Sequence, residues 1–325
     1  MKPKMSRRDA LIGGMAAAVC SQYAPPAYAV IPRPSTRVDF EVPSGACDCH
    51  FHIFGDPERF PFSAGRTYTP QMASVHASIA FHKALHLERL VVVNSLVYGA
   101  DNSCMLDALQ QFGRRSRGVA LIEDATPETD LDEMARAGVC GIRLNFVNAG
   151  ISDAAILRER FLAAVRRVHK RNWHIQIYTN LAGVVALAKE VSNAPVAVVF
   201  DHFADAKASL GVGQAGFDTL VDLVRSGKAY VKLSAAYRVS RKSPDYLDVA
   251  PLARALVGTN PERVLWGTDW PHPDTSRVAG RKATDIAPFL QIDDALLFNQ
   301  LPIWAPTAEL RRMILVENPA RLYGF

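Results

Sequence analysis

The sequence predicts a single α/β domain, a (β/α)8 barrel of the TIM type with an amino-terminal extension. The chain has 325 residues, of which 49% are hydrophobic and 21% charged, as in globular proteins. From residue 46 onward, short β-rich runs alternate with longer segments of helical periodicity. Eight such units across about 280 residues fit a barrel better than a doubly wound open sheet. No GxGxxG or GxxxxGK[ST] nucleotide motif accompanies the first strand.

Eight short segments are expected to be strands. They are 46–53, 90–94, 119–122, 141–145, 174–178, 196–201, 230–233 and 264–267. Several are apolar throughout, which is typical of parallel strands covered on both faces. Helical periodicity fills the segments between them, as at 153–170 and 216–226, and the last helix is predicted at about 307–317 with Thr307 as its N-cap. A long irregular loop, 54–70, follows the first strand, and such loops often cover an active site.

The amino terminus carries the pattern of an export signal. Ser6-Arg7-Arg8-Asp9 reads as a twin-arginine motif, an apolar run follows, and Ala27-Tyr28-Ala29 forms a small-x-small cleavage site. We therefore expect residues 1–29 to be a signal peptide and 30–325 to form the barrel. The expected location is the periplasm, or the cytoplasm if the signal is not used.

Charge and cysteine content exclude several classes of partner. The first nine residues supply about +3 of the formal charge of +5. The remaining charge of about +2 is too small to indicate a nucleic-acid-binding surface. No other stretch reaches 18 apolar residues, so no membrane contact is expected after cleavage. Four cysteines remain without a paired CxxC, which predicts neither a disulfide framework nor a structural zinc site. The sequence sets no oligomeric state.

Four of the nine histidines fall at or near the carboxyl ends of expected strands. His50 and His52 lie near the carboxyl end of the first expected strand, His202 follows the sixth and His272 follows the eighth. The carboxyl ends of barrel strands converge on one pocket. Residues two apart in a strand project from the same face, and Asp48 is expected to share it. The other histidines are expected to be structural, namely His76, His82, His86, His169 and His174.

A carboxylate lies immediately beyond the eighth expected strand, in Gly267-Thr268-Asp269-Trp270-Pro271-His272. A lone carboxylate here could simply cap a turn. Opposite two or three imidazoles, Asp269 is placed to act as a general base on water.

Taken together, these motifs resemble those of the amidohydrolase superfamily. The segments that carry the resemblance are Asp48-Cys49-His50-Phe51-His52, Asp201-His202, Gly141-Ile142-Arg143-Leu144-Asn145-Phe146 and Trp266-Gly267-Thr268-Asp269-Trp270-Pro271-His272-Pro273. More narrowly, the chain resembles the lactonase branch that contains 2-pyrone-4,6-dicarboxylate lactonase, from about residue 45 to 323. The resemblance implies a distorted barrel, with Asp269 as the base that activates water. It also implies that His50, His52 and His202 polarise a ring-ester carbonyl or hold a metal.

The resemblance further implies a set of substrate-binding residues. Arg143 would meet a carboxylate or carbonyl of the substrate, and Tyr178 and Arg238 would bind its anionic group, with His272 beside them. Arginine suits this task because its planar fork pairs bidentately with carboxylate or sulfonate.

Two alternatives for a cofactor stay open. Many amidohydrolases hold two metals with a lysine on the fourth strand and a histidine on the fifth, but this chain has Arg143 and Tyr178 there, which disfavours a two-metal site. His50, His52, His202 and Asp269 match the ligand types of a single zinc ion. The lactonase branch also allows catalysis with no cofactor at all.

The expected activity is carboxylic-ester hydrolysis. The substrate would be a small anionic lactone of the muconolactone, 4-sulfomuconolactone or pyrone-dicarboxylate type, from the breakdown of aromatic compounds. The pyrone-dicarboxylate pattern has a second arginine, a small hydroxyl residue and a histidine where this chain has Ala149, Leu96 and Tyr98, so the binding surface is altered. The alternatives are a sugar-acid lactonase or lactone isomerase, a metal-dependent decarboxylase, or an exported solute-binding protein on a dead enzyme fold.

Overall fold

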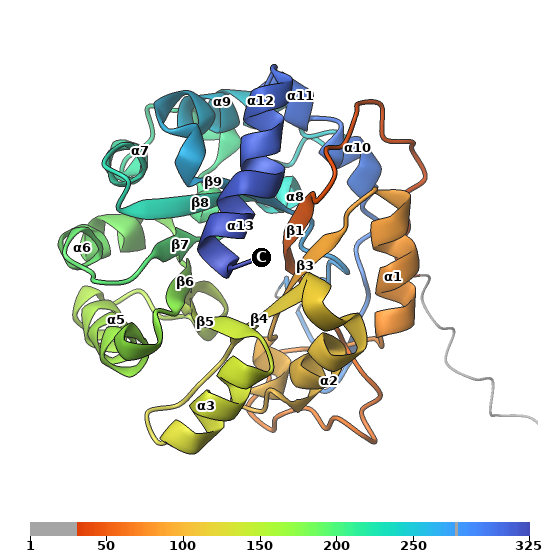
Figure 1. The fold of residues 1–325 in the computed structure, drawn as a ribbon, viewed down its shortest axis with the longest axis vertical. Helices are drawn as coiled ribbons and strands as arrows, with labels where there is room; N and C mark the ends of the chain where they lie inside the picture. The colour runs from red at the N-terminus through yellow and green to blue at the C-terminus, as the bar shows by residue number, and fades with distance from the viewer. Residues whose placement is uncertain (1–30, 277–278) are drawn as a thin grey trace, which may run out of the picture. The chain divides into compact units, whose positions relative to one another are not determined.

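The computed structural model describes residues 31–276 and 279–325, and residues 31–325 form one compact unit (Figure 1). The predicted signal peptide, 1–29, lies outside the described residues. Among the described residues, no helix combines the length and apolar character needed to cross a membrane. Their four cysteines are unpaired.

Eight parallel strands form the barrel, and each predicted strand is confirmed. They are β1 (Cys47–Phe51), β3 (Arg89–Val93), β4 (Ser116–Ala120), β5 (Val139–Asn145), β6 (His174–Tyr178), β7 (Val198–Phe200), β8 (Ala229–Ser234) and β9 (Val264–Gly267). Their order in the sheet follows the chain, as a singly wound barrel requires. A separate parallel pair joins β2 (Thr69–Pro70) to β10 (Ile286–Ala287), so the loop after β1 is tied to the segment after β9.

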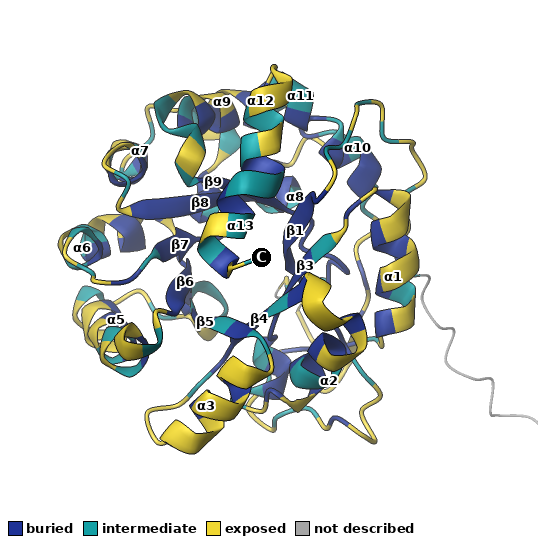
Figure 2. Cartoon of the chain, viewed as in Figure 1, coloured by how far each residue is buried: buried dark blue, intermediate teal, exposed yellow. Residues whose placement is uncertain are grey.

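Helices surround the barrel and follow its strands. The longer ones are α1 (Val75–Ala84), α2 (Ser103–Phe112), α3 (Glu128–Arg136), α5 (Ala154–Val168), α6 (Leu181–Ser192), α7 (Phe217–Arg225) and α9 (Ala250–Thr259). Two single-turn helices, α4 (Phe146–Ala149) and α8 (Ala236–Val239), directly follow β5 and β8. In Figure 2 the barrel strands are mostly buried, with a few half-buried positions in β3, β4 and β5, whereas the helices expose their outer faces.

The carboxyl-terminal helix is longer than predicted. Short helices α10 (Asp294–Phe298) and α11 (Leu301–Trp304) precede α12 (Ala308–Arg312), whose predicted cap is confirmed because Thr307 Oγ1 accepts from the Leu310 amide at 3.2 Å. A wide turn over Met313–Glu317 then continues the helix into α13 (Asn318–Tyr323). Such a wide turn is one way to pass Pro319, which has no amide hydrogen.

The barrel closes irregularly between β9 and β1. The closing backbone bonds come from residues just beyond β9, with the Asp269 amide on His50 O at 2.8 Å and the His52 amide on Trp270 O at 2.9 Å. Gly267 permits this approach, because a Cβ atom there would lie 2.8 Å from His50 N. The predicted distortion of the barrel is therefore located at this seam.

Apolar side chains fill the amino-terminal half of the barrel, and α13 covers that end. Cys47 and Cys49 of β1 pack there with Val91, Val199 and Tyr323. The carboxyl-terminal half is polar instead, which leaves the functional groups at one end.

The amino-terminal extension, residues 31–45, lies along α10 and the residues after β9. Pro32 O accepts from Trp270 Nε1 at 3.1 Å. The hydroxyls of Ser35 and Thr36 each donate to Asp293 at 2.6 Å. The extension thus supports the segment that follows Asp269.

Candidate active site

Only some of the polar side chains in and just after β1 point into the barrel. The pairing of β1 with β3 shifts register between Asp48 and Phe51. His50 and His52 point inward, but Asp48 points the other way and accepts from Thr268 Oγ1 at 2.6 Å and His82 Nε2 at 3.0 Å. The expectation that Asp48 shares the histidine face is therefore wrong, whereas the buried, hydrogen-bonded His82 is structural, as predicted.

Three imidazoles converge on one oxygen of Asp269. The Nε2 atoms of His52, His50 and His202 lie 3.4, 3.6 and 3.7 Å from Asp269 Oδ1. Asp269 reaches this position from a left-handed backbone conformation with φ of 65°, in the turn that begins directly after β9. The Nδ1 atom of each ring, on the side away from Asp269, has a polar partner that orients the ring. His52 Nδ1 lies 2.8 Å from the Val93 carbonyl oxygen.

The other oxygen of Asp269 is already occupied. Tyr237 and Arg238, both from α8, donate to Oδ2 at 2.5 and 3.0 Å. Oδ1 is therefore the oxygen left free to accept a proton or to ligate a cation.

A second buried carboxylate, Asp201, lies beneath the imidazoles. It receives Arg143 Nε at 3.0 Å and lies 3.4 Å from Lys232 Nζ. Gln176 links Asp201 to Lys232, because its Nε2 donates to Asp201 at 3.0 Å while its Oε1 accepts from Lys232 at 2.6 Å. His50 Nδ1 lies 3.2 Å from the same carboxylate, so this network orients the ring.

Burial and charge fix the ionisation of these groups. Burial opposes ionisation of Asp269, but the His202 ring and the Arg238 guanidinium more than offset it and hold the pKa of this carboxyl well below its ordinary value. Burial lowers the pKa of His202 to about 3 and that of His50 well below its ordinary value. At neutral pH the Asp269 carboxylate therefore faces the neutral imidazoles of His50 and His202.

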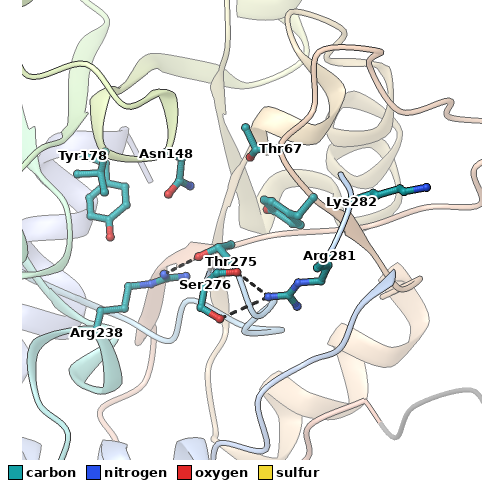
Figure 3. Close-up of a pocket in the computed structure, with 10 residues that line it drawn as sticks. Thr67, Asn148, Tyr178, Arg238, Thr275, Ser276, Arg281 and Lys282 are labelled. Carbon is teal, nitrogen blue, oxygen red and sulfur yellow. Dashed lines mark hydrogen bonds between the residues drawn. The ribbon is translucent and has the colours of Figure 1, made fainter. Parts of the chain in front are cut away.

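Two adjacent cavities lie beside these groups. An outer cavity of about 500 Å³ is lined by residues that include Tyr68, Tyr178, Arg238 and Thr275 (Figure 3). It shares these walls with an inner chamber of about 20 Å³ beside Asp269, which has room for about one water molecule. Because Thr67 and Tyr68 line the outer cavity, the predicted covering role of the loop 54–70 agrees with the structure.

Most of the predicted site residues meet at the inner chamber. His52, Arg143, Tyr178, His202, Arg238 and Asp269 all line it. His50 lies directly behind them, with its Nε2 buried and no hydrogen-bond partner among the described residues. In Figure 3 the Tyr178 hydroxyl and the Arg238 guanidinium point into the same outer space.

His272 is the exception. Its ring is fully buried and lies 2.8 Å from Asp294 and 3.3 Å from the Tyr237 hydroxyl, and it lines neither cavity. The placement of His272 among the substrate-binding residues is therefore not supported by its position. The left-handed conformation of His272, with φ of 61°, turns the ring away from the chamber.

Several residues of the site escaped the sequence analysis. Lys232 and Gln176 lie inside strands and are fully buried. A charged or amide side chain within an otherwise apolar strand is the sequence signal that could have marked them as site residues. Tyr237 precedes Arg238 in a single-turn helix, where no periodicity marks its direction.

The comparisons with known proteins agree with this geometry. The chain belongs to the amidohydrolase family, whose model matches residues 47–325. It is 37% identical over 291 residues to a 4-sulfomuconolactone hydrolase of Hydrogenophaga intermedia, covering 88% of this chain and 90% of that protein. It is 35% identical over 297 residues to a 2-pyrone-4,6-dicarboxylate hydrolase of Comamonas testosteroni, covering 89% and 93%.

A solved structure supports the same fold. The crystal structure of a candidate 2-pyrone-4,6-dicarboxylic acid hydrolase from Pseudomonas putida superimposes with a TM-score of 0.72 at 28% identity, covering 88% of this chain and 98% of that one. The predicted barrel and family are confirmed.

The residues present fit one divalent cation of the kind this family often binds. Ligand atoms of His50, His202 and Asp269 all lie within 4.8 Å of one another, and His52 lies outside this cluster. Tetrahedral ligands at zinc distances are about 3.3 Å apart, close to the separations seen here. The unpartnered His50 Nε2 is a further observation in favour of this fit.

Proposed function

We propose that this protein hydrolyses the ring ester of a small anionic lactone, of the 4-sulfomuconolactone, muconolactone or pyrone-dicarboxylate type, in the breakdown of aromatic compounds. The single observation that carries the proposal is the free Oδ1 of Asp269, which faces a water-sized chamber lined by His52 and His202. The similarity to lactone hydrolases over most of the chain supports the substrate class.

The first step is attack by water. Asp269 Oδ1 accepts a proton as the water oxygen bonds to the lactone carbonyl carbon. Negative charge then develops on the carbonyl oxygen, where donors from the chamber wall stabilise it. When no cation is bound, His202 is suited to this, because Ser234 Oγ lies 2.8 Å from its Nδ1 and can donate there, which leaves the ring proton on Nε2.

The second step opens the ring. The acyl carbon–oxygen bond breaks, and Asp269 returns the proton to the leaving oxygen, which restores the carboxylate. A divalent cation, when bound, would be held by His50, His202 and Asp269, and would polarise the carbonyl and lower the pKa of water. The residues of this chain carry the proton transfer and the substrate binding in either case.

Positive charge in the chamber supports an anionic substrate. Arg143 and Arg238 line it, and the Arg143 guanidinium lies 5.6 Å from the Tyr178 ring. With Lys232 these give three cations against Asp201 and Asp269, a local surplus of one positive charge. An anionic group would neutralise that surplus, which favours such lactones over neutral sugar lactones.

A ring-opening assay on a panel of lactones tests the proposal. The panel contains 4-sulfomuconolactone, muconolactone, 2-pyrone-4,6-dicarboxylate and a neutral sugar lactone, and the metal content of each preparation is measured. We expect turnover of at least one anionic lactone, and a fall in kcat of about a hundredfold or more in Asp269→Asn. Absence of turnover on every anionic lactone would refute the proposal, and turnover of the sugar lactone alone would replace it.

We also propose that the chain is exported to the periplasm by its twin-arginine motif, with cleavage after Ala29. The motif, the apolar run and the small-x-small site support this. Cell fractionation of wild type and of Arg7→Lys/Arg8→Lys tests it. Equal periplasmic amounts of the two would contradict the proposal.

A further inference from the structure

A buried polar chain reaches Asp269 from the side opposite the chamber, and the proposed reaction leaves it unexplained. The Tyr237 hydroxyl lies 2.5 Å from Asp269 Oδ2. His272 Nδ1 lies 3.3 Å from the same hydroxyl, and His272 Nε2 lies 2.8 Å from Asp294 Oδ2. His272 and Asp294 are 0% and 1% exposed, so their polar atoms must satisfy one another.

Counting protons along this chain fixes its direction. A separation of 2.5 Å is typical of a hydroxyl that donates to a carboxylate, so the single hydroxyl proton of Tyr237 lies toward Asp269. The Tyr237 oxygen must then accept from His272, whose Nδ1 therefore carries a proton. One more proton lies between His272 Nε2 and Asp294, and the pair is neutral overall whichever of the two holds it.

The consequence falls on Asp269. Its Oδ2 receives Tyr237 and Arg238 together, so the carboxylate cannot rotate without breaking two charge-assisted hydrogen bonds. Oδ1 is thereby kept toward the chamber. The ring of Tyr237 is itself held edge-on to His272, with the ring centroids 5.3 Å apart.

We propose that Tyr237 is a positioning residue for the hydrolysis proposed above, and that the His272–Asp294 pair keeps its hydroxyl directed at Asp269. The role rests on the proposed function. The proton taken from water moves only to Asp269 Oδ1 and then to the leaving oxygen. The hydroxyl proton of Tyr237 stays in its bond to Oδ2 throughout, so Tyr237 never contacts the reacting atoms.

Steady-state kinetics of Tyr237→Phe, His272→Leu and the double variant test the proposal. Tyr230→Phe is the matched control, since it removes the hydroxyl of a buried tyrosine in the amino-terminal half of the barrel. We expect Tyr237→Phe to lower kcat about tenfold or more with KM nearly unchanged. His272→Leu should lower kcat in the wild-type background but not in the Tyr237→Phe background, because it acts through Tyr237.

Two kinetic outcomes would overturn the proposal: a kcat of Tyr237→Phe within twofold of wild type, or effects of the two substitutions that multiply. A second measurement needs no activity and therefore separates this proposal from the proposed function. In protein labelled with 15N-histidine, the His272 signal, assigned by its loss in His272→Leu, should show a protonated Nδ1. An unprotonated Nδ1 would overturn the proposal even if lactones are hydrolysed. A protonated Nδ1 would support it even if no tested lactone is turned over.

Discussion

Replacing Asp201 by asparagine probes the charge balance beneath the active site. Asp201 is fully buried and pairs with Arg143 and Lys232, whose side chains are 5% and 0% exposed. The substitution keeps the shape and one oxygen but removes the negative charge, which leaves two buried cations without a counter-charge. Removing one partner of a buried ion pair destabilises proteins by about 3–5 kcal/mol. We expect a loss of that size in the free energy of unfolding at pH 7.

The pH dependence of this loss has a definite sign. Burial opposes ionisation of Asp201, but His50, Lys232 and Arg143 outweigh it and hold its pKa well below the ordinary value. The stabilisation is therefore complete above the unfolded pKa of about 3.9 and is lost as the pH falls through the lower folded pKa. The difference between wild type and Asp201→Asn should shrink below about pH 4.

A double variant makes this prediction sharper. Lys232→Met alone should destabilise by about 1–3 kcal/mol, because Asp201 keeps Arg143 but Gln176 loses its 2.6 Å donor. Added to Asp201→Asn, the same change removes one stranded cation and should recover about 1 kcal/mol or more. Urea unfolding followed by tryptophan fluorescence at pH 7, 5 and 3 measures each value. A further loss in the double variant would refute the reasoning.

Three further predictions concern the site itself. Arg238→Gln removes a charge that lowers the pKa of Asp269, so the acid limb of the kcat/KM profile should move to higher pH, and a limb at the same pH as in wild type would contradict this. Burial raises the pKa of Tyr178, which keeps its hydroxyl a donor, so Tyr178→Phe should raise KM about three- to tenfold with kcat nearly constant, as steady-state kinetics would show. Metal-stripped protein should bind one zinc ion in a calorimetric titration. His202→Ala should weaken that binding about tenfold or more, whereas His76→Ala, at an exposed position, should leave it unchanged. Equal zinc affinities of the two variants would argue against the proposed ligand cluster.

The barrel and the end of it that carries the site were predictable because both depend on pattern. Strands such as β3 and β7 are apolar on both faces, which sequence alone reveals. The carboxyl ends of parallel barrel strands must then meet, and His52, His202 and Asp269 do so.

What escaped prediction depends on local backbone geometry. A register shift within β1 turns Asp48 out of the barrel, although regular alternation would place it with the histidines. The left-handed backbone conformation of His272 turns its own ring behind Tyr237. Neither departure has a composition or a spacing that marks it in advance, because a bulge and a tight turn use residues common elsewhere.

The contacts of residues 31–45 limit how far the amino end can be trimmed. The Pro32 carbonyl accepts the indole hydrogen of Trp270, the residue next to Asp269. Processing after residue 29 spares that contact, but a protease that removes even a few more residues would release the indole and loosen the loop bearing the base. Preparations with ragged amino termini should therefore contain molecules of unequal specific activity, and mass spectrometry of the intact chain belongs beside every rate measurement.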